Sequence, residues 1–475
     1  MAYLCILANL NIRVMKSMNP HRYELQLARG RIRPLFIRYA VPGVVSMLFM
    51  ALQALVDGWI VGRLVCADAL AGVNITMPIY AIVTAITIVI GVGTQAHIGL
   101  HLGERDYSGA KSSLFSGAVG LIVFTVIGTL IINIFAQPMV SFLGADEDLM
   151  EYSLNYIFGV MPWLVGLAAF LFLDFQLKAL GQPRTAMTIM TCTIILNTTL
   201  SLVFVGHLKM GTLGAGLGTG ISYTAGSVVY AIYFFRTLRQ NSQVSNAEGR
   251  FSLRTLGHIC YNGSSEGLTE VAFAVVTFLF NITLMRYTGK EGVAAFTLVS
   301  NILYFGINMA LGVSNGIVPV ISYNYGAKNY RRVSEVMNLA IRTNLYSGIF
   351  FILVLCLCGR GILGFFLDPS ETEVLDMASR GAVITSIAFL FNGFNIFAAS
   401  YFTAIDRPDL SLLVAGLRGL FFLVPLILIL PVIWGMDGIW FTTPIAELGT
   451  ALVAGVIIIR HIRHLNHYET EHENI

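Results

Sequence analysis

GTQAHIGLHLG, residues 93–103, decides the fold, because the related stretch GIVPVISYNYG recurs at residues 316–326. The same offset of 223 residues places Asp106 over Asn329. A chain that repeats itself at about half its length predicts two halves with the same structure. Both stretches are rich in glycine and apolar residues, which suits helices packed closely in lipid.

The composition indicates a membrane protein. Of the 475 residues, 56% are hydrophobic and only 12% are charged, and the mean hydropathy is +0.75. A soluble chain carries about a quarter charged residues, so this chain has too little polar surface to stay in water. The net charge of +3 gives no indication of nucleic-acid binding. The six cysteines lack metal-ligand and redox spacing, and we interpret them as small core residues.

Apolar runs long enough to cross a bilayer, which takes about 20 helical residues, follow one another along the chain. They predict an all-α polytopic membrane protein of twelve transmembrane helices. The predicted spans lie near 35–62, 69–100, 110–136, 150–177, 185–206, 213–235, 259–285, 293–323, 333–358, 377–405, 410–433 and 438–459. Arg38, Arg342 and Arg418 are assigned to helix ends.

Charge placement predicts the orientation. Lysine and arginine concentrate in the segments on one side of the predicted bundle, which we assign to the cytoplasm because cytoplasmic loops carry the positive excess. Both termini are then cytoplasmic, in a bacterial inner membrane. The loops on the other side are acidic, with Asp146, Glu147 and Asp148 in one and Asp368, Glu371, Glu373 and Asp376 in another.

The N-terminal residues do not predict a signal peptide. The apolar stretch Leu4 to Leu10 precedes Arg13, whereas a signal peptide begins with its basic residues. Translation could start at Met15 or Met18 instead of Met1, which would remove this stretch.

The repeat predicts two six-helix lobes. Six spans per repeat give both lobes the same orientation, so the pseudo-twofold axis runs along the membrane normal. The predicted division is a cytoplasmic segment 1–34, an N-lobe 35–236, a cytoplasmic linker 237–256, a C-lobe 257–463 and a cytoplasmic tail 464–475. Two such lobes enclose a cleft in which alternating access can occur, and this architecture favours a transporter, expected to be a monomer.

Asp57 is the first of five acids inside the predicted spans. An ionised acid at the bilayer centre costs roughly 2.5–3.5 kcal/mol on insertion scales, so the presence of each of these acids requires a structural or functional explanation. Asp57 lies six residues before Arg63, and Gln53 shares its helix face one turn earlier. We interpret Asp57 as a proton or cation site; the alternatives are a satisfied polar contact or a pair with Arg63.

Two further acids lie on the seventh span. Glu270 is near mid-depth, with no lysine or arginine within a helical turn, and we interpret it as a second coupling site. Glu266 shares its face but lies closer to the cytoplasmic end, where a helix-start role competes with a functional one.

For the remaining two acids, structural and functional interpretations stay open. Asp174 lies four residues before Lys178, so an ion pair along one helix competes with a transport role. Glu447 lies at mid-depth on the last span.

The sequence predicts neither an enzyme nor a metal site. It contains no nucleophile elbow, P-loop or metal box. His97 and His101 have helical metal-ligand spacing but no obvious third ligand. We therefore expect no cofactor other than a coupling ion, H⁺ or Na⁺.

Four motifs occur in order along the chain: VPG through VDG to VGR within residues 41–63, AGVNITMP at 71–78, GSSEGLTE at 263–270 and GMDGIW at 435–440. In this combination the chain resembles the multidrug and toxic compound extrusion (MATE) family, especially its MepA-like branch, over about residues 30–463. The resemblance implies a two-lobe antiporter that exports cationic, amphipathic drugs against an inward flow of protons or sodium. It also implies coupling sites at Asp57 in the N-lobe and Glu270 in the C-lobe.

Departures from the family pattern leave the coupling ion open. Many members carry Asn-x-x-x-Asp on helix 5, where this chain has Asn197 and Ser201. Helix 10 carries Asn392 and Asn395 but no aspartate of the kind that some sodium-coupled members use.

Together these features predict a cation-coupled exporter of amphipathic cations that works by a rocker switch in the lipid bilayer. A flippase or exporter of lipid-linked saccharides or metabolites is the nearest alternative, although such proteins tend to have a cationic cavity and acids dominate these spans. A lipid-modifying membrane enzyme would need a nucleophile or metal cluster at a helix end.

Overall fold

The structure is a computed structural model that describes residues 27–367 and 371–473, with side chains described as far as Arg463. In these ranges the chain folds into helices and contains no strand. The predictions about the start residue, about segment 1–26 and about Asp368 lie outside the described residues, as do the side chains of the predicted tail.

The first lobe runs from α3 to α9. Polar residues begin its helices where the chain turns: the carboxylate of Asp106 accepts a hydrogen bond from the Gly109 backbone N–H at 2.9 Å, which caps α5. The elements are α3 (Ile32–Leu64), α4 (Ala67–Glu104), α5 (Tyr107–Phe142), α6 (Glu147–Val160), η1 (Met161–Trp163), α7 (Leu164–Ala179), α8 (Pro183–Ser201), η2 (Leu202–His207) and α9 (Gly211–Gln240).

The short helix α10 (Ser242–Asn246) connects this lobe to the second one. The Ser252 hydroxyl accepts a hydrogen bond from the Thr255 N–H and begins the second lobe. Its elements are α11 (Leu253–Gly326), α12 (Tyr330–Gly364), α13 (Thr372–Ser386), α14 (Phe389–Ala404), α15 (Pro408–Gly416), η3 (Leu417–Phe421), α16 (Leu423–Trp434) and α17 (Met436–Glu473).

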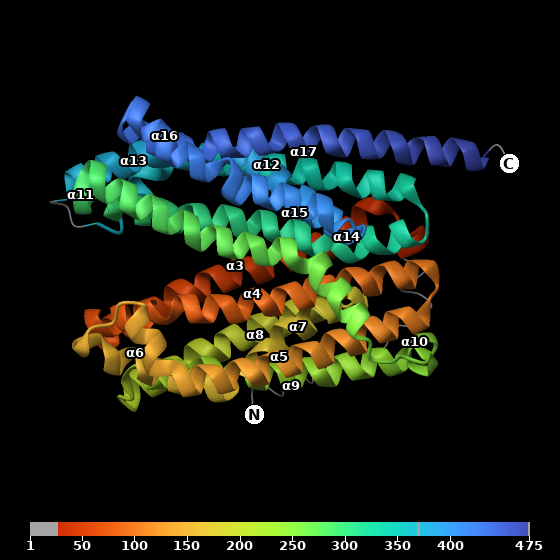
Figure 1. Cartoon of the computed structure of the whole chain (residues 1–475), viewed down its shortest axis with the longest axis horizontal. Helices are drawn as coiled ribbons and strands as arrows, with labels where there is room; N and C mark the ends of the chain where they lie inside the picture. Colours follow the sequence, from red (N-terminus) through yellow and green to blue (C-terminus); the bar gives the residue numbers. More distant parts are fainter. Residues whose placement is uncertain (1–26, 368–370, 474–475) are drawn as a thin grey trace.

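Within the described residues, nine helices are long and apolar enough to cross a membrane, and the pair α13–α14, bent by 53°, makes a tenth span. Helix α11, 74 residues long, provides two of the twelve spans, because Gly289 (φ 68°, ψ −150°) breaks it and the chain turns back there (Figure 1). The 30-residue α9 completes the set. The predicted all-α fold of twelve helices in two lobes is confirmed.

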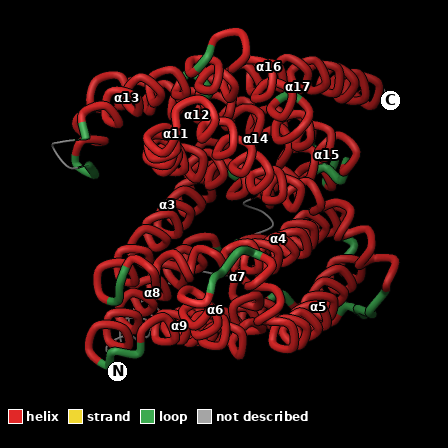
Figure 2. The backbone as a smooth tube through the Cα atoms, turned by 60° about the vertical axis from the view of Figure 1, so that its left-hand side comes forward, coloured by secondary structure: helices red, strands yellow, loops and turns green. Residues whose placement is uncertain are grey.

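The lobes meet at one end of the bundle, which we call the closed end; it carries the α4–α5 turn and α10. There Ala96, Ile98 and Leu102 of α4 share one buried apolar cluster with Ile317 and Ile321 of α11. At the opposite end, which carries the α3–α4 turn and Gly289, the two bundles of ribbons diverge (Figures 1 and 2). We call this the open end.

Glycines allow the close approach at the closed end. A Cβ atom on Gly43 would lie 2.2 Å from the carbonyl oxygen of Gly312, and one on Gly93 would lie 2.2 Å from that of Ile259. Since no side chain fits into such a gap, the glycine-rich stretch at 93–103 brings α4 into backbone contact with α11.

Candidate functional site

The N-lobe holds a buried polar cluster between α3, α8 and α9, which we call the Asp57 cluster (Gln53, Asp57, Asn197, Thr219 and Tyr223). The Gln53 amide lies 3.3 Å from Asp57 Oδ2 and donates to Asn197 Oδ1 at 3.0 Å. The Tyr223 hydroxyl donates to Gln53 Oε1 at 2.9 Å, and Asn197 Nδ2 donates to Thr219 Oγ1 at 3.2 Å. The structure therefore brings three of the predicted polar residues together: Gln53, Asp57 and Asn197.

Asp57 has no cationic partner among the residues that the structure describes, so the alternative of an ion pair with Arg63 is not observed. Its Oδ1 atom is buried and accepts no hydrogen bond from any described residue. Tyr80 and Tyr156, both neutral phenols, lie within its electrostatic range. A buried carboxylate oxygen in neutral surroundings is a favourable place for a proton or a small cation.

Ser201, the other predicted polar position on α8, does not join this cluster. It lies against α9, where a Cβ atom on Gly218 would come within 2.7 Å of its hydroxyl oxygen. The departure from the family pattern at Ser201 thus provides helix packing and no ligand to Asp57.

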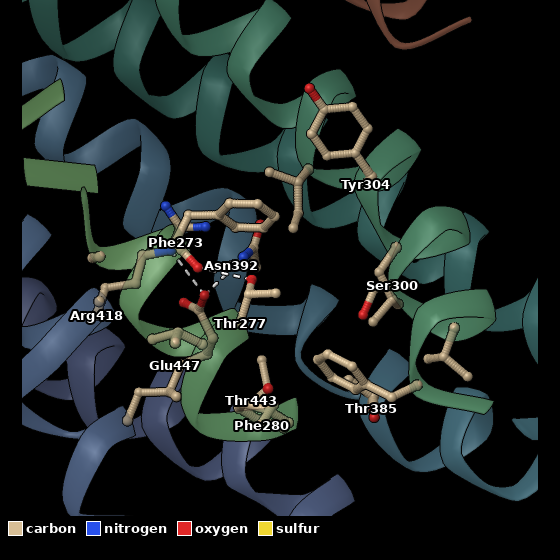
Figure 3. Close-up of a pocket in the computed structure, with 18 of the residues that line it drawn as sticks. Phe273, Thr277, Phe280, Ser300, Tyr304, Thr385, Asn392, Arg418, Thr443 and Glu447 are labelled. Atoms are coloured by element: carbon tan, nitrogen blue, oxygen red, sulfur yellow. Dashed lines mark hydrogen bonds and ion pairs between the residues drawn. The ribbon is translucent and has the colours of Figure 1, made fainter. Parts of the chain in front are cut away.

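The C-lobe encloses a cavity of about 350 Å³ between the two arms of α11 and the helices α13 to α17 (Figure 3). Aromatic side chains form much of its wall, with threonine, serine and asparagine side chains between them. The aromatic lining residues are Phe273, Phe280, Phe296, Tyr304 and Trp440. An apolar wall with dispersed polar groups suits an amphipathic molecule.

Glu447 lies at the edge of this cavity and is only 4% exposed. Arg418 donates to its Oε1 at 2.9 Å, Asn392 donates to the same oxygen at 2.7 Å, and Asn395 donates to Oε2 at 2.7 Å. Figure 3 shows Arg418 and Asn392 converging on the carboxylate. We call Glu447, Arg418, Asn392 and Asn395 the Glu447 cluster.

The assignment of Arg418 to a helix end was wrong. Arg418 lies in η3, a π-helical turn between α15 and α16, and this wider turn carries its side chain to α17. Glu447 therefore has a balancing cation, which the distribution of charges along the sequence did not predict. The available signal was an arginine inside the apolar run 410–433.

Glu270 and Glu266 lie on α11 and do not line the cavity. Ser400, Glu270 and Arg418 are neighbours of Glu266. Glu270 has no hydrogen bond or ion pair to any described residue, and its electrostatic neighbours include Tyr304.

Two tyrosines are neighbours of the predicted coupling acids. Tyr80 of α4 is within electrostatic range of both Asp57 and Tyr304, and Tyr304 of α11 is within that range of Glu270. The structure keeps Asp57 and Glu270 in different lobes, and each acid has a tyrosine of its own lobe as a neighbour.

Asp174 belongs to a structural contact. Its carboxylate forms an ion pair with Lys178, one turn along α7, and lies 2.8 Å from the Tyr230 hydroxyl. Asp174 and Lys178 are only 2% and 3% exposed. The structure therefore contains the ion pair with Lys178 that was one of the two interpretations of Asp174.

His97 lies in a group of possible metal ligands that does not include His101. The chain brings His258 of α11 and Asp406 of the α14–α15 turn beside His97, with one ligand atom from each within 4.8 Å of the others. Burial alone would raise the pKa of Asp406, but the imidazoles of His97, His258 and His101 hold it below its ordinary value.

A family model, MatE, matches residues 42–203 and 267–429, one segment in each lobe. The chain belongs to the MatE family. This is a family of multidrug efflux transporters, and its members are transporters rather than enzymes. The chain is accordingly a multi-pass membrane protein.

The curated relatives and solved structures agree with this assignment. The multidrug export protein MepA of Staphylococcus aureus (strain MSSA476) is 24% identical over 436 residues, covering 89% of this chain and 92% of the relative. MepA of Staphylococcus saprophyticus is 23% identical with the same coverage. A multidrug resistance MATE transporter solved in an outward-facing conformation superimposes with a TM-score of 0.84 at 22% identity, covering 93% of this chain and 98% of that one; it supports the fold.

Proposed function

We propose that this MatE family member exports small amphipathic, cationic molecules in exchange for an inward-moving cation, H⁺ or Na⁺. It acts as a monomer in a bacterial inner membrane with both termini in the cytoplasm, so that the closed end faces inward. It needs no cofactor beyond the coupling ion.

The observation that carries this proposal is the environment of Asp57. Its buried Oδ1 atom has no partner among the described residues, and its neighbours are an amide and phenols. Burying a carboxylate without a counterion is costly, so an incoming proton or Na⁺ would bind favourably there. A bound cation would in turn reduce the attraction of the lobe for a cationic substrate.

The second coupling group is Glu270. It has no ion pair among the described residues, and its neighbour Tyr304 is also a neighbour of Tyr80 in the N-lobe. Aromatic faces next to uncompensated acids attract organic cations. A substrate held near Tyr80 and Tyr304 would sense both acids, and rocking of the lobes would expose it to each side of the membrane in turn.

The flippase alternative is less favoured. Arg418 and Glu447 are the charged residues among those that line the cavity, and they neutralise each other. A lipid-linked saccharide or other anionic headgroup would therefore find no unpaired cation there.

Everted membrane vesicles provide the test. The proton gradient and the sodium gradient are collapsed in separate experiments. Dye efflux should fall in only one of them, and that experiment identifies the coupling ion. Asp57→Asn and Glu270→Gln should each lower coupled flux at least about tenfold, which corresponds to about 1.4 kcal/mol, whereas the exposed Glu373→Gln should leave it unchanged. If both acid variants keep full ion-coupled flux, the proposal is wrong.

A further inference from the structure

The closed end holds a group of side chains that the transport proposal does not use. His97 and His101 come from α4 in the N-lobe, whereas His258 and Asp406 come from the C-lobe. His97 Nε2 lies 3.4 Å from Asp406 Oδ1, and His258 Nε2 lies 3.7 Å from Asp406 Oδ2. The rings of His97 and His258 are 4.9 Å apart at 78°. The carboxylate thus lies between two imidazoles from different lobes.

We propose that His97, His258 and Asp406 form a binding site for a divalent transition metal ion of the zinc type, and that the bound ion ties the two lobes together at the closed end.

The donor set matches this class of ion. Zinc and its neighbours favour imidazole nitrogen and carboxylate oxygen, and bonds of about 2.0–2.1 Å place tetrahedral ligand atoms about 3.3 Å apart. The 3.4 Å between His97 and Asp406 already has this spacing, and the 3.7 Å to His258 is close to it. With three protein ligands, the fourth position is left for water.

Unsatisfied polar atoms support a ligand between these residues. His97 is 5% exposed. Its Nε2 atom and Asp406 Oδ1 lie 3.4 Å apart without hydrogen-bond geometry, and neither atom has a hydrogen-bond partner among the described residues. His101 Nδ1, by contrast, faces the carboxylate of Asp106, whose Oδ2 atom lies 3.2 Å away. Buried polar atoms that face one another without a hydrogen bond are costly, and a metal ion would satisfy them together. The side chain of His258 is 50% exposed, so an ion can enter from the solvent at this end.

Contacts within the C-lobe hold its half of the site in place. Asp406 has φ 59° at the end of α14, where its N–H donates to the Thr403 carbonyl oxygen at 3.2 Å. Asn262 of α11, one turn after His258, donates to the same carbonyl oxygen at 3.0 Å. This bond fixes the α14–α15 turn against α11 within one lobe.

The N-lobe supplies its ligand only while the lobes touch. His97 lies one turn after Gly93, whose backbone packs against Ile259, the neighbour of His258. Separation of the lobes here would withdraw His97 and leave a two-ligand site. An ion that binds one arrangement more tightly shifts the population towards it, so bound metal should favour the arrangement in which this end is closed. This second part rests on the proposed alternation between two states; metal binding itself does not.

Metal binding is tested on the full chain in lipid nanodiscs, with His464, His467 and His472 replaced by glutamine in every protein to remove histidines of the tail. Zn²⁺ titrated against a chromophoric chelator should bind with one ion per chain. His97→Asn, His258→Ala and Asp406→Asn should each weaken binding at least about tenfold. His207→Ala, an exposed histidine at the open end, should leave it unchanged.

Unfolding midpoints without metal identify any variant that fails to fold, and His258→Ala is the safest because that side chain is half-exposed. Absence of Zn²⁺ binding in the parent protein would overturn the site. Equal binding by the parent and folded His97→Asn would show that the metal does not bridge the lobes.

The effect on the lobes is measured separately. Spin labels at Arg184→Cys and Arg331→Cys, one exposed position per lobe at the closed end, would report their separation by electron double resonance in a background without the six native cysteines. Zn²⁺ should narrow the distance distribution to its short component, and His258→Ala should abolish this change. Binding without any change in the distribution would refute the tie between the lobes while leaving the metal site and the transport proposal intact.

Discussion

Asp57 in the N-lobe and Glu447 in the C-lobe are both acids held inside the bundle next to amide side chains, yet only Glu447 has an arginine beside it. Three donors satisfy the carboxylate of Glu447, whereas Asp57 has one long contact from Gln53 and a buried oxygen without a partner. The same repeated scaffold therefore supports two kinds of buried acid. An acid paired with arginine is compensated within the lobe, and an acid among neutral groups remains available to a mobile cation.

The largest expected effect tests the paired side of this comparison. Arg418→Ala leaves Glu447 buried and uncompensated, and it should lower the free energy of unfolding by about 3–5 kcal/mol. Chemical denaturation in detergent, followed by tryptophan fluorescence, measures the change.

Its control is the exposed pair of Arg360 and Asp376, whose side chains are 66% and 61% exposed. Arg360→Ala should cost no more than about 1 kcal/mol, because surface ion pairs contribute little. Replacing both Arg418 and Glu447 by methionine should recover most of the stability lost in the single variant. Similar small losses for Arg418→Ala and Arg360→Ala would contradict the structural role of the Glu447 cluster.

The next largest expected effect tests Asp57, the acid that lies among neutral groups. Asp57→Asn keeps the size of the side chain and removes an unpaired charge, so its free energy of unfolding should change by less than about 1 kcal/mol, within the range of a single neutral hydrogen bond. Coupled efflux should nevertheless fall at least about tenfold. Glu447→Gln should have the opposite balance of effects: a large loss of stability, because Arg418 is left unpaired, and a smaller effect on efflux relative to that loss.

The free energy of unfolding and the coupled efflux of both variants are measured on the same preparations, so that the two effects can be compared directly. If Asp57→Asn destabilises the protein as strongly as Glu447→Gln does, Asp57 has a structural role and the distinction between the two acids fails.

The smallest expected effect concerns the support of Asp57. Tyr223→Phe removes the hydroxyl that donates to Gln53, which should cost about 0.5–1.5 kcal/mol of stability. With Gln53 less firmly held, the concentration of coupling ion needed for half-maximal efflux should change several-fold while maximal efflux changes little. A matched control is Tyr346→Phe, at a side chain that is 68% exposed. An equal response of both variants would exclude a positioning role for Tyr223.

Much of the fold and part of the candidate site were predictable from the sequence. Hydrophobic length determines where a chain crosses lipid, and every predicted span corresponds to observed helices, although the span 377–405 is divided into α13 and α14 by a bend of 53°. Gln53 and Asp57 were predictable together, since residues four apart share a helix face. The amide of Asn197 was predicted as a polar site from the family pattern, although its bond to Gln53 was not.

The contacts across distant segments could not be predicted in this way. Arg418 reaches Glu447 because a π-helical turn places it, although 29 residues separate them. His97 meets His258 and Asp406 because glycines let α4 and α11 approach until their backbones touch.

The sequence by itself determined the membrane class, the spans and the duplication, because hydrophobicity and periodicity are local properties of the chain. Only the tertiary structure decided which buried charges are compensated. The energy of a buried acid depends on which groups lie within a few ångströms of it, and that proximity comes from helix packing. The repeat that begins at Gly93 therefore predicted two similar lobes, and their packing made one acid structural and left another available for coupling.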